Sequence, residues 1–260
     1  INAIFLTLIF RKSDFRNMGV SGRMRTMQRI KPTTGQIYHI YNRGVEKRKI
    51  FLKEVDYVRF IHDLFEFNDE NPAGIKLAYH ARRVGIEGVG FPKRNREPRK
   101  LLIELYAFSL MPNHFHFMVR QKVDGGITEF MRKIGTGYTN YFNNKYDRVG
   151  PLFQGRYKMI RIANEGHFIH LPYYIHLNAL DLSMPKWREQ ESLDYKKAMA
   201  DLEKYRWSSY LDYIGKRNFP SVSERGFLLS LSNGTKNYKQ NIINWLRKRD
   251  LDQLKGFLLE

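Results

Sequence analysis

The sequence predicts an α+β protein built on a ferredoxin-like βαββαβ sheet with added helices. Three observations predict this class: short stretches that alternate in polarity, longer stretches with apolar residues three and four apart, and the order of the two kinds along the chain. With 260 residues, 42% of them hydrophobic, the chain can bury a core and still carry an additional segment.

The elements follow in a simple order. A strand is expected over residues 35–42, closed by the turn residues Arg43 and Gly44, and an amphipathic helix over 54–68. Strands over 101–110 and 114–120 should meet at the Met-Pro-Asn turn of residues 111–113. A helix over 128–146, with Thr128 as its N-cap, a strand over 156–162 and a helix over 164–180 complete the predicted core.

Three segments lie outside this core. Residues 1–29 are expected to be a leader, disordered or not native, because the apolar run at 1–10 is too short to span a bilayer. Residues 81–100, after a strand-like stretch at 75–79, form a predicted basic loop or hairpin. Beyond the core domain at 30–183, the helical patterns at 193–204, 208–214 and 237–249 indicate a helical accessory region over 184–260.

The charge balance indicates a polyanionic partner. Lys and Arg number 45 against 26 Asp and Glu, a formal charge of +19, and 16 Tyr and 18 Phe could stack on exposed bases. Nucleic acid therefore fits better than a membrane surface, although a basic surface without a partner remains an alternative. The absence of cysteine excludes disulfides, Cys-ligated zinc and a thiol nucleophile.

Four residues form a candidate chemical site. His114 and His116 should leave the same face of one strand, so their imidazoles could converge on a divalent ion. Tyr174 and Asn178, four apart, should share one face of a helix, and an amide oxygen suits Mg²⁺ or Mn²⁺. Two half-buried strand histidines and one more core tyrosine are the plainer interpretation of the same residues.

The wider sequence resembles a known family. Residues 109–119 (SLMPNHFHFMV) are similar to the His-x-His strand of single-tyrosine HUH transposases, and residues 153–158 (FQGRYK) and 173–178 (YYIHLN) resemble two later blocks of that family. Together with residues 205–210 (YRWSSY), they resemble the REP-associated tyrosine transposases most closely. The resemblance covers roughly residues 37–214.

The resemblance implies a metal-dependent endonuclease and strand transferase acting on hairpin-flanked single-stranded DNA. His114, His116 and Asn178 would hold Mg²⁺ or Mn²⁺, and Tyr174 would form a 5′-phosphotyrosine. Such a protein would act as a monomer or a homodimer in the bacterial cytoplasm, near the nucleoid. DNA contacts would come from six cations, for which an ordinary solvated role is the alternative: Arg43, Arg156 and Lys158 near the site, and Lys93, Arg94 and Arg96 in the basic loop.

Several alternatives stay open at this stage. Tyr173 could replace Tyr174 as the nucleophile, and His170 could carry a proton or be a spectator. Pro172 predicts a helix that either kinks or begins near it. The basic helix predicted at 237–249 could clamp DNA, cover the site or simply be solvated. The main rival function is a catalytically inactive DNA or RNA hairpin binder, and an RNA-binding sheet with stacking aromatic residues ranks lower.

Overall fold

The computed structural model describes residues 31–71, 98–189 and 192–248, and its centre is a four-stranded antiparallel sheet. The strands are β1 (Ile37–Arg43), β2 (Ile103–Met111), β3 (His114–Gln121) and β4 (Lys158–Arg161). Their order across the sheet is β2-β3-β1-β4, and every neighbouring pair is antiparallel. With one helix between β1 and β2 and another between β3 and β4, this is the βαββαβ arrangement that the sequence predicts.

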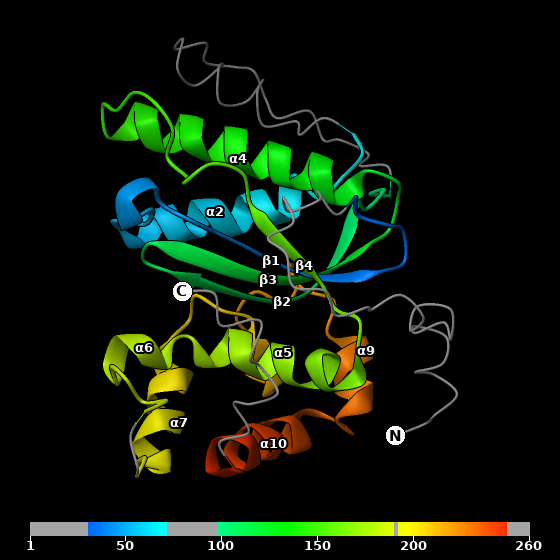
Figure 1. The fold of residues 1–260 in the computed structure, drawn as a ribbon, viewed down its shortest axis with the longest axis vertical. Helices are drawn as coiled ribbons and strands as arrows, with labels where there is room; N and C mark the ends of the chain where they lie inside the picture. The colour runs from blue at the N-terminus through cyan, green and yellow to red at the C-terminus, as the bar shows by residue number, and fades with distance from the viewer. Residues whose placement is uncertain (1–30, 72–97, 190–191, 249–260) are drawn as a thin grey trace, which may run out of the picture.

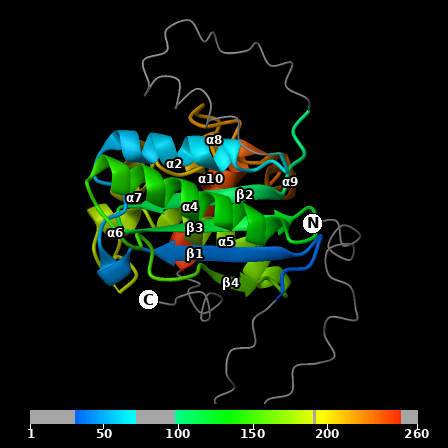
Figure 2. The same cartoon turned by 90° about the horizontal axis from the view of Figure 1, so that it is seen from above.

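One face of the sheet is covered by α2 (Glu54–Glu66) and α4 (Gly126–Lys145), which lie side by side over the strands and run roughly along them (Figures 1 and 2). Phe115, Phe117 and Val119 of β3 point into this layer, where they join the core formed with the two helices. Asp56 ties the helices together: it is buried and accepts hydrogen bonds from Tyr141, Lys145 and Tyr146 of α4 and the residue after it.

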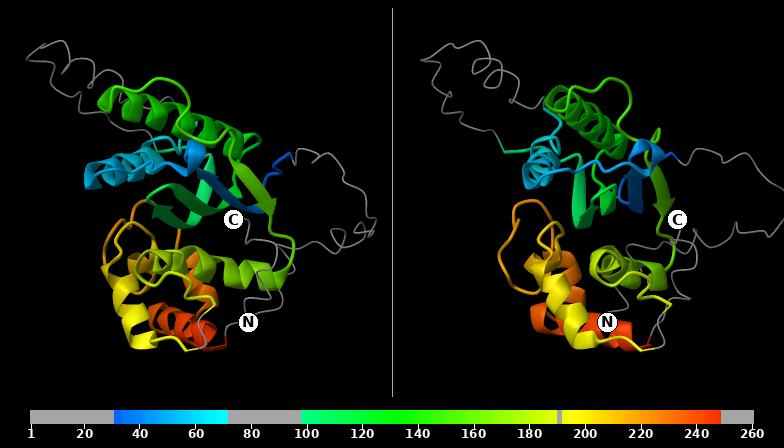
Figure 3. Two further views of the ribbon diagram at one scale, coloured as in Figure 1. Left: turned by 60° about the vertical axis from the view of Figure 1, so that its left-hand side comes forward. Right: turned by 90° about the vertical axis from the view of Figure 1, so that its left-hand side faces the viewer.

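The opposite face is covered by α5 (Glu165–Leu177) and the helices after it: α6 (Leu180–Ser183), α7 (Tyr195–Lys204), α8 (Tyr210–Tyr213), α9 (Gly226–Leu231) and α10 (Thr235–Lys248). The views in Figure 3 show the sheet between the two helical layers. Every residue of α5 from Leu171 to Leu177 is buried, because the helix packs against the sheet on one side and against the later helices on the other.

Every second side chain of β1 and β3 lies on the face of the sheet that α5 covers. His116 and Met118 of β3 and Ile37, His39 and Tyr41 of β1 all belong to this face, since their neighbours in sequence enter the other core. The His-x-His strand and the tyrosine helix therefore meet across a single interface.

The residues after α6 also join the sheet itself. Ser208 forms a bridge to Ser109 of β2, the Leu110 amide donates to the Trp207 carbonyl, and Ser209 Oγ accepts from the Phe108 amide. The segment that the sequence indicated as an accessory region thus contributes side chains to the same core as α5.

Several local expectations are corrected. The N-cap of α4 is Gly125, in the left-handed conformation, and Thr128 lies inside the first turn. Pro172 lies within α5, which begins at Glu165 after the N-cap Asn164, so the helix does not begin at the proline. Helix α9 was not predicted, and the strand-like stretch at 75–79, most of the basic loop and residues 1–29 lie outside the described residues.

Candidate functional site

The His-x-His pair lies at the start of β3 on the face that α5 covers. The imidazole centroids of His114 and His116 are 5.0 Å apart and nearly perpendicular. Burial lowers the pKa of His114 to about 4 and, as the largest cause, holds the pKa of His116 well below its usual value. Both rings are therefore neutral at pH 7, which is the form that binds metal ions.

Each histidine has one nitrogen engaged. His114 Nδ1 lies 2.7 Å from Asn113 Oδ1, while its buried Nε2 has no hydrogen-bond partner among the described residues. His116 Nδ1 lies 2.9 Å from Nε2 of His39, a fully buried histidine of β1. A partner on the second nitrogen of each ring is the usual means of fixing the orientation of a metal-binding histidine.

Sequence reasoning missed His39. Its only signal was its position two residues before Tyr41 in the first strand pattern, and nothing local links that strand to β3. The link comes from the pairing register, which places Tyr41 opposite His116 and Arg43 opposite His114.

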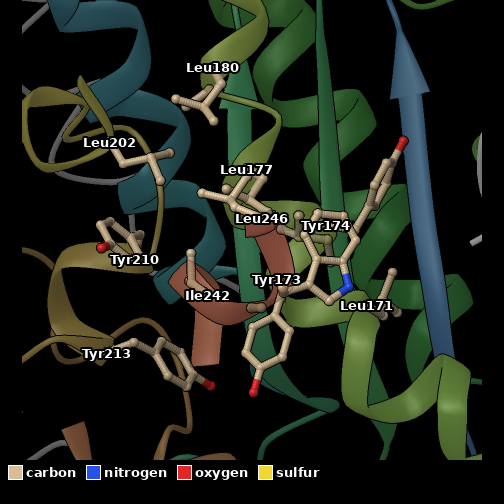
Figure 4. Close-up of a cluster of buried hydrophobic side chains, with 14 of the residues drawn as sticks. Leu171, Tyr173, Tyr174, Leu177, Leu180, Leu202, Tyr210, Tyr213, Ile242 and Leu246 are labelled. Atoms are coloured by element: carbon tan, nitrogen blue, oxygen red, sulfur yellow. The ribbon is translucent and has the colours of Figure 1, made fainter. Parts of the chain in front are cut away.

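Tyr173 and Tyr174 are adjacent on α5 and point in opposite directions, as Figure 4 shows. The Tyr174 ring meets His116 edge-on with centroids 5.7 Å apart and lies 6.0 Å from His39. Tyr173 points into the tail, the described residues after α6 (184–189 and 192–248), where its hydroxyl is hydrogen-bonded to Asn241 and Ser232 and burial raises its pKa. Only Tyr174 therefore faces the histidine pair.

Asn178, the C-cap of α5, lies one turn after Tyr174 and is fully buried. Its Nδ2 donates to the Tyr174 carbonyl at 3.0 Å, and its Oδ1 accepts from the guanidinium of Arg188 at 3.3 Å. Arg188 also donates to Asp181 Oδ1 at 2.5 Å, and its guanidinium lies 5.8 Å from the centre of the Tyr174 ring. Arg188 is the second site residue that sequence reasoning missed.

The donor set fits a hard divalent ion. The two neutral imidazoles share one face of β3, the amide of Asn178 would be the third donor, and the orphaned Nε2 of His114 is a buried nitrogen that a ligand would satisfy. Within the described part of the chain, no three His, Asp or Glu side chains are grouped for metal binding. The expected ligand set therefore depends on the amide.

Three of the predicted DNA-binding cations lie at the nearby edge of the sheet. Arg156 and Lys158 are exposed at the start of edge strand β4, and Lys158 pairs with Tyr41. Arg43, at the end of β1, donates to Gln154. None of the three forms an ion pair with a described carboxylate, so their charge remains available. Lys93, Arg94 and Arg96 lie outside the described residues.

His170 lies beside Tyr173, with ring centroids 6.3 Å apart. Its role as a proton carrier for Tyr174 stays a prediction.

Comparison with known proteins identifies the segment that carries the site. Residues 98–178 match the family model described as "Transposase IS200 like". This segment is similar to the IS200-like transposases. It runs from the residues before β2 to Asn178 and so includes His114, His116, Tyr174 and Asn178, although it covers only about a third of the 260 residues.

A search of solved structures also gives a match. It is described as "Structure of the REP associates tyrosine transposase bound to a REP hairpin", with 15% sequence identity and a TM-score of 0.41 over 80% of this chain and 96% of that chain. No curated protein gives a significant match. Within the described residues, every helix is too short or too polar to cross a bilayer.

Proposed function

We propose that this protein cleaves and rejoins single-stranded DNA beside a hairpin, with Tyr174 as the nucleophile. The observation that carries the proposal is the convergence of one helix and one strand: Tyr174 meets His116 edge-on, and Asn178 lies one turn further along α5. The similarity of residues 98–178 to IS200-like transposases supports a DNA-processing reaction at the same residues.

In the proposed reaction, the Tyr174 oxygen attacks the scissile phosphorus and loses its proton to solvent. The bond from phosphorus to the 3′ oxygen breaks, and that oxygen takes up a proton to become a free 3′-OH. The DNA then remains attached as a 5′-phosphotyrosine, and attack by a 3′-OH on this link reverses the chemistry without an external energy source.

The remaining side chains would orient the reactants. His114, His116 and Asn178 would hold a divalent ion, which when bound polarises the phosphate and eases attack by a weakly acidic phenol. Arg43, Arg156 and Lys158 would contact the DNA backbone at the adjacent sheet edge. Tyr174 is 2% exposed in this conformation, so the DNA strand must displace part of its cover to reach it.

The test uses labelled single-stranded hairpins from the DNA flanking the gene, with Mg²⁺ or Mn²⁺. We expect a covalent protein–DNA adduct with the wild type and with Tyr173→Phe, and none with Tyr174→Phe. Tyr173→Phe is a matched control because the two tyrosines are neighbours on one helix and only Tyr174 faces the histidines.

The outcomes separate the alternatives. An adduct that persists in Tyr174→Phe would reject the assigned nucleophile. Salt-dependent hairpin binding without an adduct under either metal would reject the enzymatic proposal and leave a catalytically inactive hairpin binder.

A further inference from the structure

The segment after α6 brings a cation into the site. Trp187 is buried in the core and donates its indole N–H to Asp181 Oδ1 at 2.8 Å, which fixes the backbone beside Arg188. The same carboxylate oxygen accepts from Arg188 at 2.5 Å. Arg188 therefore has a defined position over α5 without belonging to it.

The guanidinium of Arg188 faces the groups expected to react. It lies 5.8 Å from the centre of the Tyr174 ring and bonds Asn178 Oδ1 at 3.3 Å. Its positive charge also contributes, after burial, to the low pKa values of His114 and His116. An ordinary structural ion pair would need only the contact with Asp181.

Three buried polar atoms of the candidate site lack a hydrogen-bond partner among the described residues: Arg188 Nε, Tyr41 Oη and His114 Nε2. Tyr41 and His114 flank His116, with ring centroids 5.7 Å and 5.0 Å from it. Arg188 Nε and Tyr41 Oη are donors, and buried donors are rarely left unpaired in native proteins, so they indicate a ligand with acceptor oxygens. His114 Nε2 is instead the lone-pair nitrogen of a ring that donates through Nδ1, and it suits the metal ion.

We infer that Arg188 binds a non-bridging oxygen of the scissile phosphate through its free Nε–H and stabilises the charge that develops there. This inference rests on the proposed function and adds to it a phosphate-binding residue supplied by the segment after the tyrosine helix. A guanidinium suits the role because it remains charged at any working pH and its planar set of donors matches phosphate oxygens. Asp181 then acts as a positioning residue that holds Arg188.

The experiment measures single-turnover adduct formation at saturating hairpin, together with hairpin Kd and Tm, for wild type, Arg188→Gln and Arg188→Lys. Arg225→Gln is the matched control, because Arg225 is also half-buried and its guanidinium bonds, among the described residues, the carbonyls of Pro220 and Ser223 in its own segment. We expect Arg188→Gln to slow adduct formation by about 100-fold, the loss typical of removing one charge-stabilising donor, while Arg225→Gln reacts like the wild type. Arg188→Lys should recover part of the rate.

The rate ratio between the two phosphorothioate diastereomers at the scissile position gives a further test. This ratio would not change if Arg188 had only a structural role. If Arg188 contacts one non-bridging oxygen, Arg188→Gln should change this ratio relative to the wild type and to Asp181→Asn. The inference would be overturned by a wild-type rate in Arg188→Gln, or by a slower rate with a lowered Tm and an unchanged diastereomer ratio. In either case, an adduct formed by the wild type would leave the proposed function intact. Absence of the adduct in the wild type would overturn both.

Discussion

His39 shows how one buried side chain can control another. It lies on β1 two residues before Tyr41, which pairs with His116, and its Nε2 is 2.9 Å from His116 Nδ1. Burial lowers the pKa of His39 to about 3, so both rings are neutral and one N–H is shared between them. If His116 binds a metal through Nε2, its Nδ1 must carry that proton and donate to His39.

Replacing His39 should therefore weaken metal binding. We expect His39→Phe, which keeps a ring of similar size but removes the acceptor, to lower Mn²⁺ affinity by about 10–100-fold, the usual cost of losing such a partner. His39→Gln restores an acceptor and should recover part of the affinity, while His167→Gln in the first turn of α5 should leave it unchanged. Isothermal titration with Mn²⁺ gives the constants, and equal affinity for wild type and His39→Phe would contradict the assigned role.

The sequence predicts only those site residues that are related within one strand or one helix. His114 and His116, like Tyr174 and Asn178, are related by the period of a single strand or helix, so local geometry is enough to predict that each pair shares a face. His39 reaches the site through strand pairing, and Arg188 reaches it because the chain reverses after α6. Neither relation leaves a periodic signal, so neither residue could be predicted.

At the scale of elements, α5 owes its position to buried polar links as well as to its apolar surface. His176 is fully buried, and its Nε2 lies 2.7 Å from Ser209 Oγ while its Nδ1 lies 2.8 Å from the Tyr238 hydroxyl. Ser209 in turn bonds β2 through the Phe108 amide. One histidine thus connects the tyrosine helix to the sheet and to α10.

This link makes stability depend on pH. Burial lowers the pKa of His176 to about 3 in the folded protein, whereas the unfolded chain has the ordinary value near 6.5. Neutral His176 therefore contributes its full stability above pH 6.5, and that stability is lost as the pH falls toward 3, because the unfolded state takes up a proton first. His176→Gln should remove up to one proton from the pH slope in this window, about 1.4 kcal/mol per pH unit.

Urea unfolding at intervals between pH 7 and pH 4 measures this slope. The variant should be less stable than the wild type at pH 7, since Ser209 and Tyr238 lose a well-placed partner, but its stability should decline less steeply with acid. Parallel curves for the two proteins would show that His176 does not titrate differently in the folded and unfolded states.

At the scale of the whole molecule, the uneven charge distribution should govern affinity for DNA. The chain carries a formal charge of +19, and three cations without described ion pairs, Arg43, Arg156 and Lys158, gather at the sheet edge beside the His-x-His pair. Each phosphate contact releases counterions, so the affinity for a hairpin should fall as salt rises.

Replacing these three cations with Gln should lower hairpin affinity and reduce the slope of log K against log[salt] by about 2–3, close to one per lost phosphate contact. The control replaces three exposed cations elsewhere, Lys196, Lys197 and Arg217, and should change the slope by less than one unit. Fluorescence anisotropy from 50 to 300 mM salt, about the range over which such slopes are measurable, compares the two variants. Equal slopes would place the DNA-binding surface elsewhere.

The sequence predicts a domain boundary near residue 183, yet the packing ties the two parts together. Tyr213, Tyr238, Ile242 and Leu246 of the tail belong to the same buried cluster as α5, and Trp207 stacks on Tyr57 of α2 with centroids 4.6 Å apart. A large apolar side chain is worth about 1.5–3 kcal/mol when buried. Losing several of them exceeds the net stability of about 5–15 kcal/mol that a typical domain has.

A chain truncated after Ser183 should therefore fail to fold on its own. It would expose one whole side of α5 to water, and with it the helix that positions Tyr174. We expect no cooperative thermal transition and strong binding of a hydrophobic dye, whereas a chain ending after Lys248 should melt cooperatively. If the shorter chain instead melts cooperatively and binds hairpins, the tail is a separate accessory region, as the change of pattern after residue 183 indicates.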